Sequence, residues 1–130
     1  MGLRSFHLGL EHPFFVAGTG RFCTELMTVA SGRIVAKGGA SGVSGIGILA
    51  KAAGALPMLR GARGGVGIAL KMEDGGPYGV REVAAAEGLR QLGALDDAEL
   101  AALQAHARPE VRNSPGDVVG EARPVFSLAA

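Results

Sequence analysis

The stretch that decides the fold is GTGRFCTELMTVASGRIVAKGGASG, residues 18–42. From Thr19 onward its apolar residues recur at the spacing of one helix face. These residues are Phe22, Cys23, Leu26, Met27 and Ala30. Thr19 or Gly20 can cap the start of this helix, and Gly32 stands where a helix end favours a left-handed residue. A glycine-bracketed loop followed by a helix is therefore predicted.

A short apolar strand is predicted directly after this helix, over residues 33–37, with Ile34 and Ala36 on one side. It carries Lys37 to its end, where Gly38 and Gly39 follow. The sequence thus places a loop with many backbone N–H groups close to a cationic side chain. Most of the chemistry that the sequence indicates lies here.

Two further segments read as strands. Residues 40–48 can pair back on the first strand, and residues 65–72 (GVGIALKM) form a nearly continuous apolar run. Such a run is typical of a strand that is covered on both faces. Residues 49–63 between them read as a long connection, and residues 73–77 (EDGGP) as a turn.

Two helices and a tail complete the chain. A helix is predicted over residues 80–92, followed by a short one that ends at Pro109. Asp96 and Glu99 have the spacing of a capping box at the start of the second helix. The tail, residues 118–126, is predicted to form an edge strand, because Pro124 is tolerated only at an edge.

Composition indicates one small domain. The chain has 130 residues, of which 48% are hydrophobic but only 5% aromatic, so the core is expected to consist of Ala, Val, Leu and Ile. The 22 glycines follow no period and are expected at turns, strand ends and close backbone contacts.

Charge and cysteine content exclude several classes of protein. The net charge is +1 and no Lys/Arg cluster occurs, so neither a nucleic acid nor a membrane is an expected partner. Cys23 is the single cysteine, which excludes an internal disulfide and fits a reducing compartment. The N-terminus lacks a signal-peptide pattern, and a cytoplasmic location is expected.

Five stretches, in order, resemble the C-terminal half of bacterial asparaginase II proteins, the group typified by the inducible, thermolabile L-asparaginase of rhizobia. They are HPFFVAGTGRFCTELM (12–27), GRIVAKGGASGV (32–43), GVGIALKMEDG (65–75), QLGALDD (91–97) and RPEVRNSPGDVVGEARP (108–124). The resemblance starts near residue 11 and is interrupted between residues 46 and 63. It implies that residues 1–130 are a single incomplete domain, with a non-homologous or disordered segment at residues 1–10.

The resemblance also implies a fold and an activity. The family's fold is similar to that of serine β-lactamases and penicillin-binding proteins, an α+β architecture with an antiparallel sheet and flanking helices. Its members are homodimers that hydrolyse L-asparagine, a small-molecule substrate, to L-aspartate and ammonia. Their nucleophile is the serine of an S-x-x-K motif in the N-terminal half. The Lys37-Gly38-Gly39 sequence resembles the K-T-G element of β-lactamases, which makes Lys37 the candidate catalytic residue.

The chain departs from this pattern in one central respect. No serine is followed three residues later by a lysine, at any of Ser5, Ser31, Ser41, Ser44, Ser114 and Ser127. We therefore expect a fragment or truncated reading frame that lacks the nucleophile half and is inactive alone.

Each candidate site residue also has a purely structural explanation. Lys37 could activate a serine or bind a carboxylate, or be a solvated lysine at a strand end. The loop of Gly18, Thr19, Gly20 and Arg21 could bind the substrate α-carboxylate together with Gly38 and Gly39, or be an ordinary helix start. Cys23 lies near the site, where a structural role as a small hydrophobe is favoured.

No cofactor and no metal are expected. His7, His12 and His106 are scattered, and together with one cysteine they do not have the spacing of a metal site. Some asparaginases of this kind bind zinc through cysteines and a lysine, but in the half that this chain lacks.

Two other functions stay open at this point. The chain could be a non-catalytic interaction module or remnant that needs a partner chain. It could also be a small anion- or nucleotide-binding domain that uses the helix start at residues 18–21.

Overall fold

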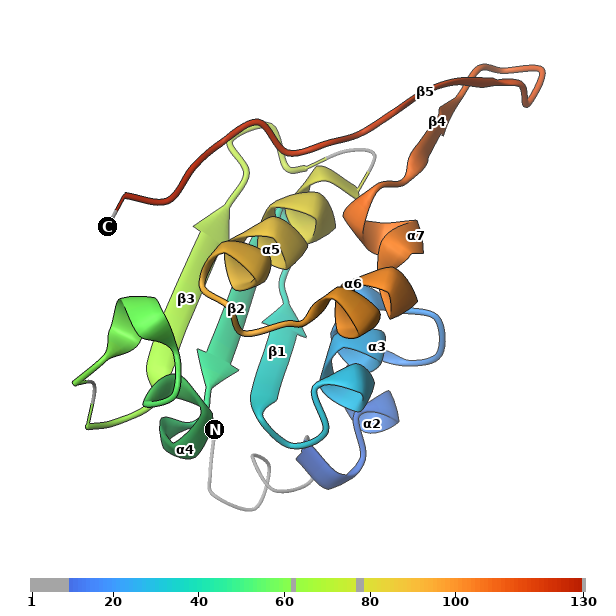
Figure 1. Cartoon of the computed structure of the whole chain (residues 1–130). Helices are drawn as coiled ribbons and strands as arrows, with labels where there is room; N and C mark the ends of the chain where they lie inside the picture. Colours follow the sequence, from blue (N-terminus) through green and yellow to red (C-terminus); the bar gives the residue numbers. More distant parts are fainter. Residues whose placement is uncertain (1–9, 62, 77–78, 130) are drawn as a thin grey trace.

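The computed structural model describes residues 10–61, 63–76 and 79–129 and has an α+β architecture (Figure 1). The expected N-terminal segment, residues 1–10, lies outside the described residues except for residue 10, as do His7 and the end of the predicted turn at Pro77. The α+β class with an antiparallel sheet and flanking helices is confirmed.

The first predicted helix forms, but it begins later than expected. After α2 (Phe14–Ala17), α3 runs over Phe22–Val29. Its N-cap is Arg21, in an extended conformation and without a side-chain cap, so the prediction of Thr19 or Gly20 as the cap is wrong. The cause is local: Gly20 has a φ of +70°, which places it in the turn ahead of the helix. The residues of the predicted helix face are all buried: Phe22, Cys23, Leu26, Met27 and Ala30.

Three antiparallel strands form the main sheet. They are β1 (Ile34–Gly38), β2 (Val43–Ile48) and β3 (Val66–Lys71), in the order β1-β2-β3. The register pairs Lys37 with Gly45 and Ile46 with Ile68. Both the hairpin between the first two strands and the strand near residues 65–72 are therefore confirmed.

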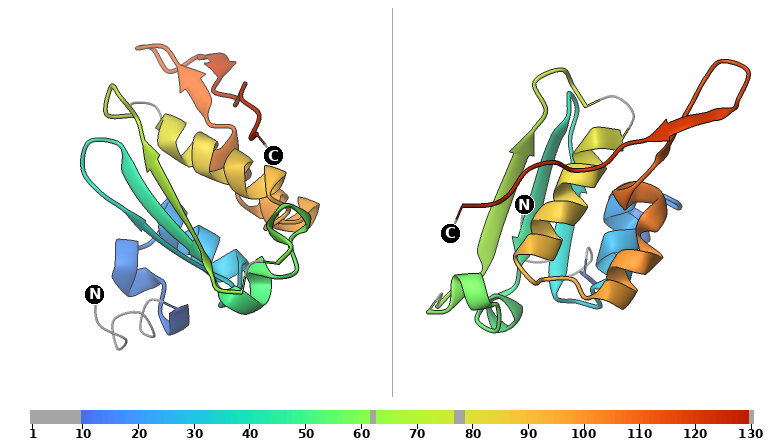
Figure 2. Two further views of the ribbon diagram at one scale, coloured as in Figure 1. Left: turned by 90° about the vertical axis from the view of Figure 1, so that its left-hand side faces the viewer. Right: turned by 45° about the horizontal axis from the view of Figure 1, so that its top comes forward.

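One face of the main sheet is covered by helices. Figure 2 shows α5 (Val80–Gln91) lying on the same side of the sheet as α3 and the two helices that follow α5. Ile34 and Ala36 are buried on this face, as predicted from their alternation. The prediction that β3 is covered on both faces is wrong, because its residues alternate between half-buried and exposed. A continuous apolar run also results when the exposed positions are filled by glycine and alanine, as at Gly67 and Ala69.

The segment between β2 and β3 has short helices of its own. It contains α4 (Ala50–Ala53) and the 3₁₀ turn η1 (Pro57–Leu59). Ala53 and Leu56 reach into the core, which ties the connection to the end of the sheet.

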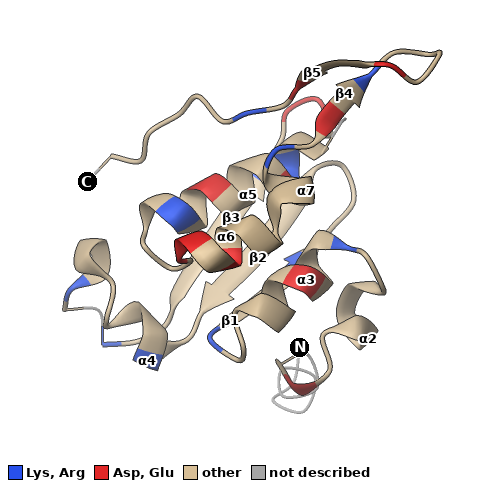
Figure 3. Ribbon diagram, turned by 45° about the vertical axis from the view of Figure 1, so that its right-hand side comes forward, with Lys and Arg blue, Asp and Glu red and all other residues tan. Residues whose placement is uncertain are grey.

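The helix predicted over residues 80–92 is α5, and Leu89 on its inner face is fully buried. The next predicted helix is divided into α6 (Asp97–Ala102) and α7 (Gln104–Ala107). Asp96 and Glu99 form the predicted capping box. Both acidic and basic residues occur along α5 (Figure 3), and none of the described helices is long and apolar enough to cross a membrane.

The tail forms a strand in a second, two-stranded sheet. β5 (Val118–Glu121) pairs with β4 (Glu110–Arg112), a strand that the sequence did not indicate. This hairpin extends away from the main sheet, and the chain then returns across α5 (Figure 1). Gln91 fixes the returning segment, because its side chain donates to the carbonyl of Phe126 and accepts from the N–H of Leu128.

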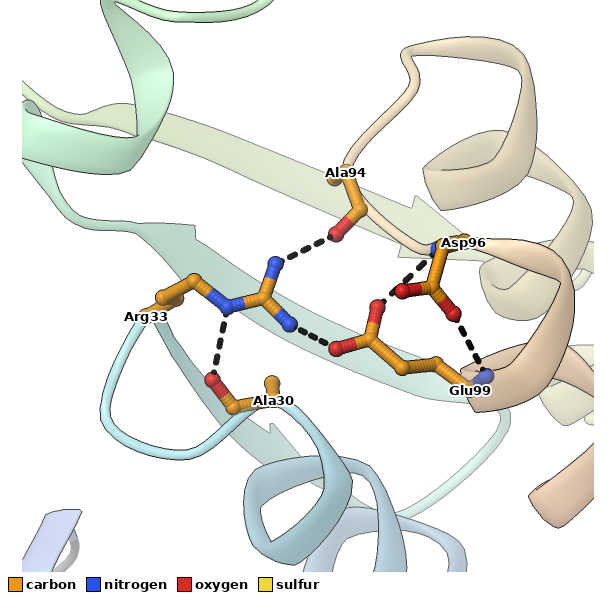
Figure 4. A network of polar contacts seen from close by, with 5 residues as sticks. All are labelled: Ala30, Arg33, Ala94, Asp96 and Glu99. Carbon is orange, nitrogen blue, oxygen red and sulfur yellow. Dashed lines mark hydrogen bonds and ion pairs between the residues drawn. The ribbon is translucent and has the colours of Figure 1, made fainter.

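A polar network joins the end of α3 to the start of α6 (Figure 4). The Arg33 guanidinium donates to the carbonyl oxygens of Ala30 at 3.0 Å and Ala94 at 3.1 Å, and it pairs with the Glu99 carboxylate. Glu99 also accepts from the backbone N–H of Asp96. Arg33 thus connects the C-terminal end of α3 to the capping box of α6, which lies more than sixty residues later in the chain.

Candidate functional site

A cavity of about 380 Å³ lies where α2, α3, β1 and α5 come together. It opens beside Gly38, the last residue of β1, and Gly39, which follows it. The residues that line it are Phe15, Val16, Ala17, Arg21, Phe22, Cys23, Lys37, Gly38, Gly39, Ala40, Arg81 and Glu82.

Lys37 stands on the wall of this cavity. Its side chain is exposed, and its Nζ donates a hydrogen bond to the carbonyl oxygen of Val16 at 2.8 Å. Val16 lies in α2, just ahead of the loop at residues 18–21. Strand β1 therefore places the Lys37 ammonium close to the loop at residues 18–21, as the sequence predicts.

Arg81 is the site residue that the sequence analysis missed. Its guanidinium donates to the carbonyl oxygens of Gly39 at 3.1 Å and Val43 at 3.3 Å, and it pairs with Glu82. It lies over Gly38, where an added Cβ would be 3.3 Å from Arg81 Nη1. Strands β2 and β3 and the short helices α4 and η1 separate Arg81 from Lys37 in the chain, so no local spacing links them. The one weak signal in the sequence that could have indicated Arg81 is its position in the first turn of a predicted helix, directly after a glycine-rich turn.

The loop at residues 18–21 contributes to the cavity mainly through Arg21. The carbonyl oxygen of Gly18 accepts a hydrogen bond from Thr24 Oγ1 at 2.6 Å, which fixes the loop to the first turn of α3. Gly18 and Thr19 do not line the cavity. Gly20 lines a neighbouring cavity of about 420 Å³, which shares Arg21 and Arg81 with the first.

Cys23 lines the cavity but belongs to the core, with 6% of its surface exposed. Burial raises the pKa of its thiol, and the backbone of Gly38 and the charge of Arg81 oppose this rise only in part. A buried thiol with a raised pKa is a poor nucleophile, since the thiolate is the reactive form. The structural interpretation of Cys23 is the better supported one.

The lining of the cavity defines what it can bind. Arg21, Lys37 and Arg81 bring three positive charges against the single carboxylate of Glu82, which favours an anionic group. Among the described residues that line it, none carries a serine or threonine hydroxyl. No group of three His, Cys, Asp or Glu side chains suited to a metal ion occurs in the described part of the chain. The cavity therefore offers a cationic binding wall without a hydroxyl nucleophile of its own.

Comparison with known proteins identifies the family. A search of curated proteins finds no match. The family model described as L-asparaginase II matches residues 4–124, which is most of the chain. The protein that carries this cationic cavity at the end of an antiparallel strand belongs to the L-asparaginase II family.

Proposed function

We propose that this chain supplies the cationic wall of an asparaginase-like site that hydrolyses L-asparagine to L-aspartate and ammonia. The observation that carries the proposal is the Lys37 ammonium, which lines the cavity at the end of β1 together with Arg21 and Arg81. Membership of the L-asparaginase II family supports an asparaginase-like function and a small-molecule substrate.

Lys37 is the proposed catalytic residue. A lysine beside a serine can assist proton transfer from the hydroxyl and stabilise negative charge that develops on the amide oxygen. Gly38, Gly39 and Arg21 line the same cavity. We assign substrate binding to these three residues and to Gly20 in the neighbouring cavity, and a positioning role to Gly18 and Thr19, which belong to the same loop but do not line the cavity.

The nucleophile in this proposal comes from an S-x-x-K segment that these 130 residues do not contain. The proposal includes a β-lactamase-like arrangement, in which a strand that ends in lysine and glycine borders the reacting centre. The antiparallel β1-β2-β3 sheet with helices on one face supports such an arrangement. The chain alone is then expected to release no ammonia.

The test is complementation. The chain is co-expressed with the N-terminal half of a family member that contains S-x-x-K, and ammonia release from L-asparagine is measured. Lys37→Met should lower kcat at least about 100-fold, the usual size of a proton-transfer contribution. Lys71→Met is the matched control, because Lys71 also ends a strand and donates to backbone carbonyls but lies away from the cavity. Activity that persists in Lys37→Met at the level of Lys71→Met would contradict the role of Lys37.

A non-catalytic role is the second candidate. It is favoured by the absence of a hydroxyl among the described residues that line the cavity. If it holds, calorimetry should show binding of L-aspartate or L-asparagine to the chain, weakened by Arg21→Ala, while the complemented assembly releases no ammonia.

A further inference from the structure

A half-buried histidine, His106, joins α7 to the first turn of α3. Its Nε2 atom lies 2.8 Å from a carboxylate oxygen of Glu25, which stands 81 residues earlier in the chain. The side chain of His106 is 21% exposed and that of Glu25 is 40% exposed, so the pair lies at the edge of the core. The contact therefore connects two helices that are distant in sequence.

The imidazole ring of His106 also packs against Phe22. The two ring centroids are 5.6 Å apart and the rings are tilted by 66°, an edge-to-face arrangement that aromatic rings prefer. Phe22 and Glu25 are three residues apart in α3, so they share one face of its first turn. His106 thus holds this turn at two points. We define the α3 clasp as His106, Phe22 and Glu25.

The start of α3 has few other anchors. Thr24 fixes the preceding loop through the carbonyl oxygen of Gly18, but no side chain caps the helix itself. Arg21, the N-cap residue, accepts a hydrogen bond at its carbonyl oxygen from the backbone N–H of Glu25 at 3.0 Å. The residue that His106 holds is therefore bonded directly to the N-cap. The α3 clasp supplies a restraint that a capping side chain provides in other helices.

The same turn carries residues of the candidate site. Arg21 and Phe22 line the cavity beside Lys37 and also the neighbouring cavity, which His106 lines as well. Arg21 is exposed, so the backbone that carries it sets where its charge lies. A displacement of the helix start would move one charge of the cationic wall and one aromatic side of the cavity together.

We propose that His106 is a positioning residue for substrate binding, which fixes the Arg21 guanidinium at the cavity through the α3 clasp. This inference rests on the proposed function, in which Arg21 binds the α-carboxylate of L-asparagine. That carboxylate takes no part in the bond changes and is present in substrate and transition state alike. Loss of the positioning should therefore weaken substrate binding without slowing the chemical step.

Steady-state kinetics of the complemented assembly test this role. His106→Leu keeps an apolar side chain beside Phe22 but loses the donor to Glu25. It should raise KM for L-asparagine about tenfold, while kcat changes less than about threefold. His106→Gln is the conservative variant, because its amide supplies an N–H donor in place of Nε2, and it should bring KM to within about threefold of wild type.

The matched control is Arg108→Leu, which breaks an exposed ion pair with Glu121 two residues after His106 and should leave KM unchanged. Glu25→Leu should raise KM as His106→Leu does. The double variant should be no worse than either single one, because both changes remove the same bond. A KM that His106→Leu leaves unchanged, or a loss confined to kcat, would overturn the proposal.

Amide hydrogen exchange of the chain alone tests the α3 clasp without substrate. His106→Leu should accelerate exchange of the Glu25 N–H at least about tenfold, because local opening of the first turn exposes that group. The rise should exceed that of the Leu89 N–H, which lies in the buried part of α5, and Arg108→Leu should cause none. An equal rise at Glu25 and Leu89 would show general destabilisation and would overturn the positioning role.

The two measurements distinguish a failure of this inference from a failure of the proposed function. If the wild-type assembly releases no ammonia, the proposed function fails, and the exchange of the Glu25 N–H still decides whether His106 fixes the start of α3. If the assembly is active and the exchange responds to His106→Leu while KM does not, the positioning of Arg21 is overturned and the proposed function stands.

Discussion

The Nζ of Lys37 lies 2.8 Å from the carbonyl oxygen of Val16, to which it donates a hydrogen bond. This contact joins the end of β1 to the helical turn ahead of the loop at residues 18–21. It holds the ammonium at the cavity and uses one of its three donors. A lysine held in this way can bind an anion without a large change in its own position.

Replacement of Lys37 by methionine should have little effect on folding. Lys37 is exposed, and a single hydrogen bond at the surface contributes about 1 kcal/mol or less to the free energy of unfolding. Urea denaturation of the wild-type chain and Lys37→Met should therefore agree within about 1 kcal/mol, as should Lys71→Met. A loss of more than about 2 kcal/mol would show that Lys37 has a structural role, and the loss of activity in the variant would then need another explanation.

Alanine should stabilise the protein at Gly45 but not at Gly38. Both glycines lie in strands and neither has a positive φ, but a Cβ on Gly38 would be 3.3 Å from Arg81 Nη1, whereas a Cβ on Gly45 meets nothing within 4 Å. Gly45→Ala should raise the free energy of unfolding by about 0.5 kcal/mol, because alanine restricts the unfolded chain. Gly38→Ala should give no gain, since the Arg81 guanidinium must shift. Equal effects in the two variants would show that Arg81 is not held over Gly38.

The Cys23 thiol should be slow to react and should make stability depend on pH in the alkaline range. Its pKa is raised in the folded chain by burial, so the folded state holds the proton more tightly than the unfolded state does. The stability contribution of this group is complete below the unfolded pKa, about 8.5, and is lost as the pH rises through the raised native value. Alkylation by iodoacetamide at pH 7.5 should be at least about tenfold slower in the folded chain than in urea.

The matched variant for this prediction is Cys23→Ala. It should lose less free energy of unfolding between pH 7 and pH 10 than the wild-type chain does, although it is less stable at pH 7 because of the cavity it leaves. If the two proteins respond equally to pH, Cys23 is not the group that titrates.

The sequence predicted most of the elements because their signals are local. The burial of Leu26 and Ile34 follows from spacing along one helix and one strand, and the capping box at Asp96 needs only four consecutive residues. The candidate site residues within residues 18–42 could be predicted from local sequence signals of the same kind. Arg21, Lys37 and Gly38 do line one cavity.

What the sequence did not reveal depends on contacts between distant segments. Arg81 donates to the carbonyl oxygen of Gly39 from a helix that starts 41 residues later, at Val80, and neither segment alone indicates that contact. The exposure of β3 was misjudged because glycine and alanine at Gly67 and Ala69 look apolar in sequence, although they lie on an open face. The β4 strand was missed because three residues are too few to show an alternation.

The pairing of Arg33 with Glu99 should contribute measurably to stability. Arg33 also donates to two backbone carbonyls, so Arg33→Ala should lower the free energy of unfolding by about 2 kcal/mol, mainly because the Ala94 carbonyl loses its donor and the Ala30 carbonyl keeps only the backbone N–H of residue 33. Arg33→Lys keeps the charge but not the planar arrangement of donors, and it should recover less than half of that loss.

A double-mutant cycle separates the ion pair from the carbonyl bonds and from the helix cap. The second change is Glu99→Gln, because a glutamine side-chain oxygen can still accept from the Asp96 N–H and preserve the capping box. The Arg33 side chain is 40% exposed and that of Glu99 18%, so solvent screens the pair and the coupling should be about 1 kcal/mol at low salt. The coupling should decrease in 1 M NaCl, since screening weakens a partly exposed ion pair. Additive losses in the two single variants would show that the carbonyl bonds alone account for the effect of Arg33.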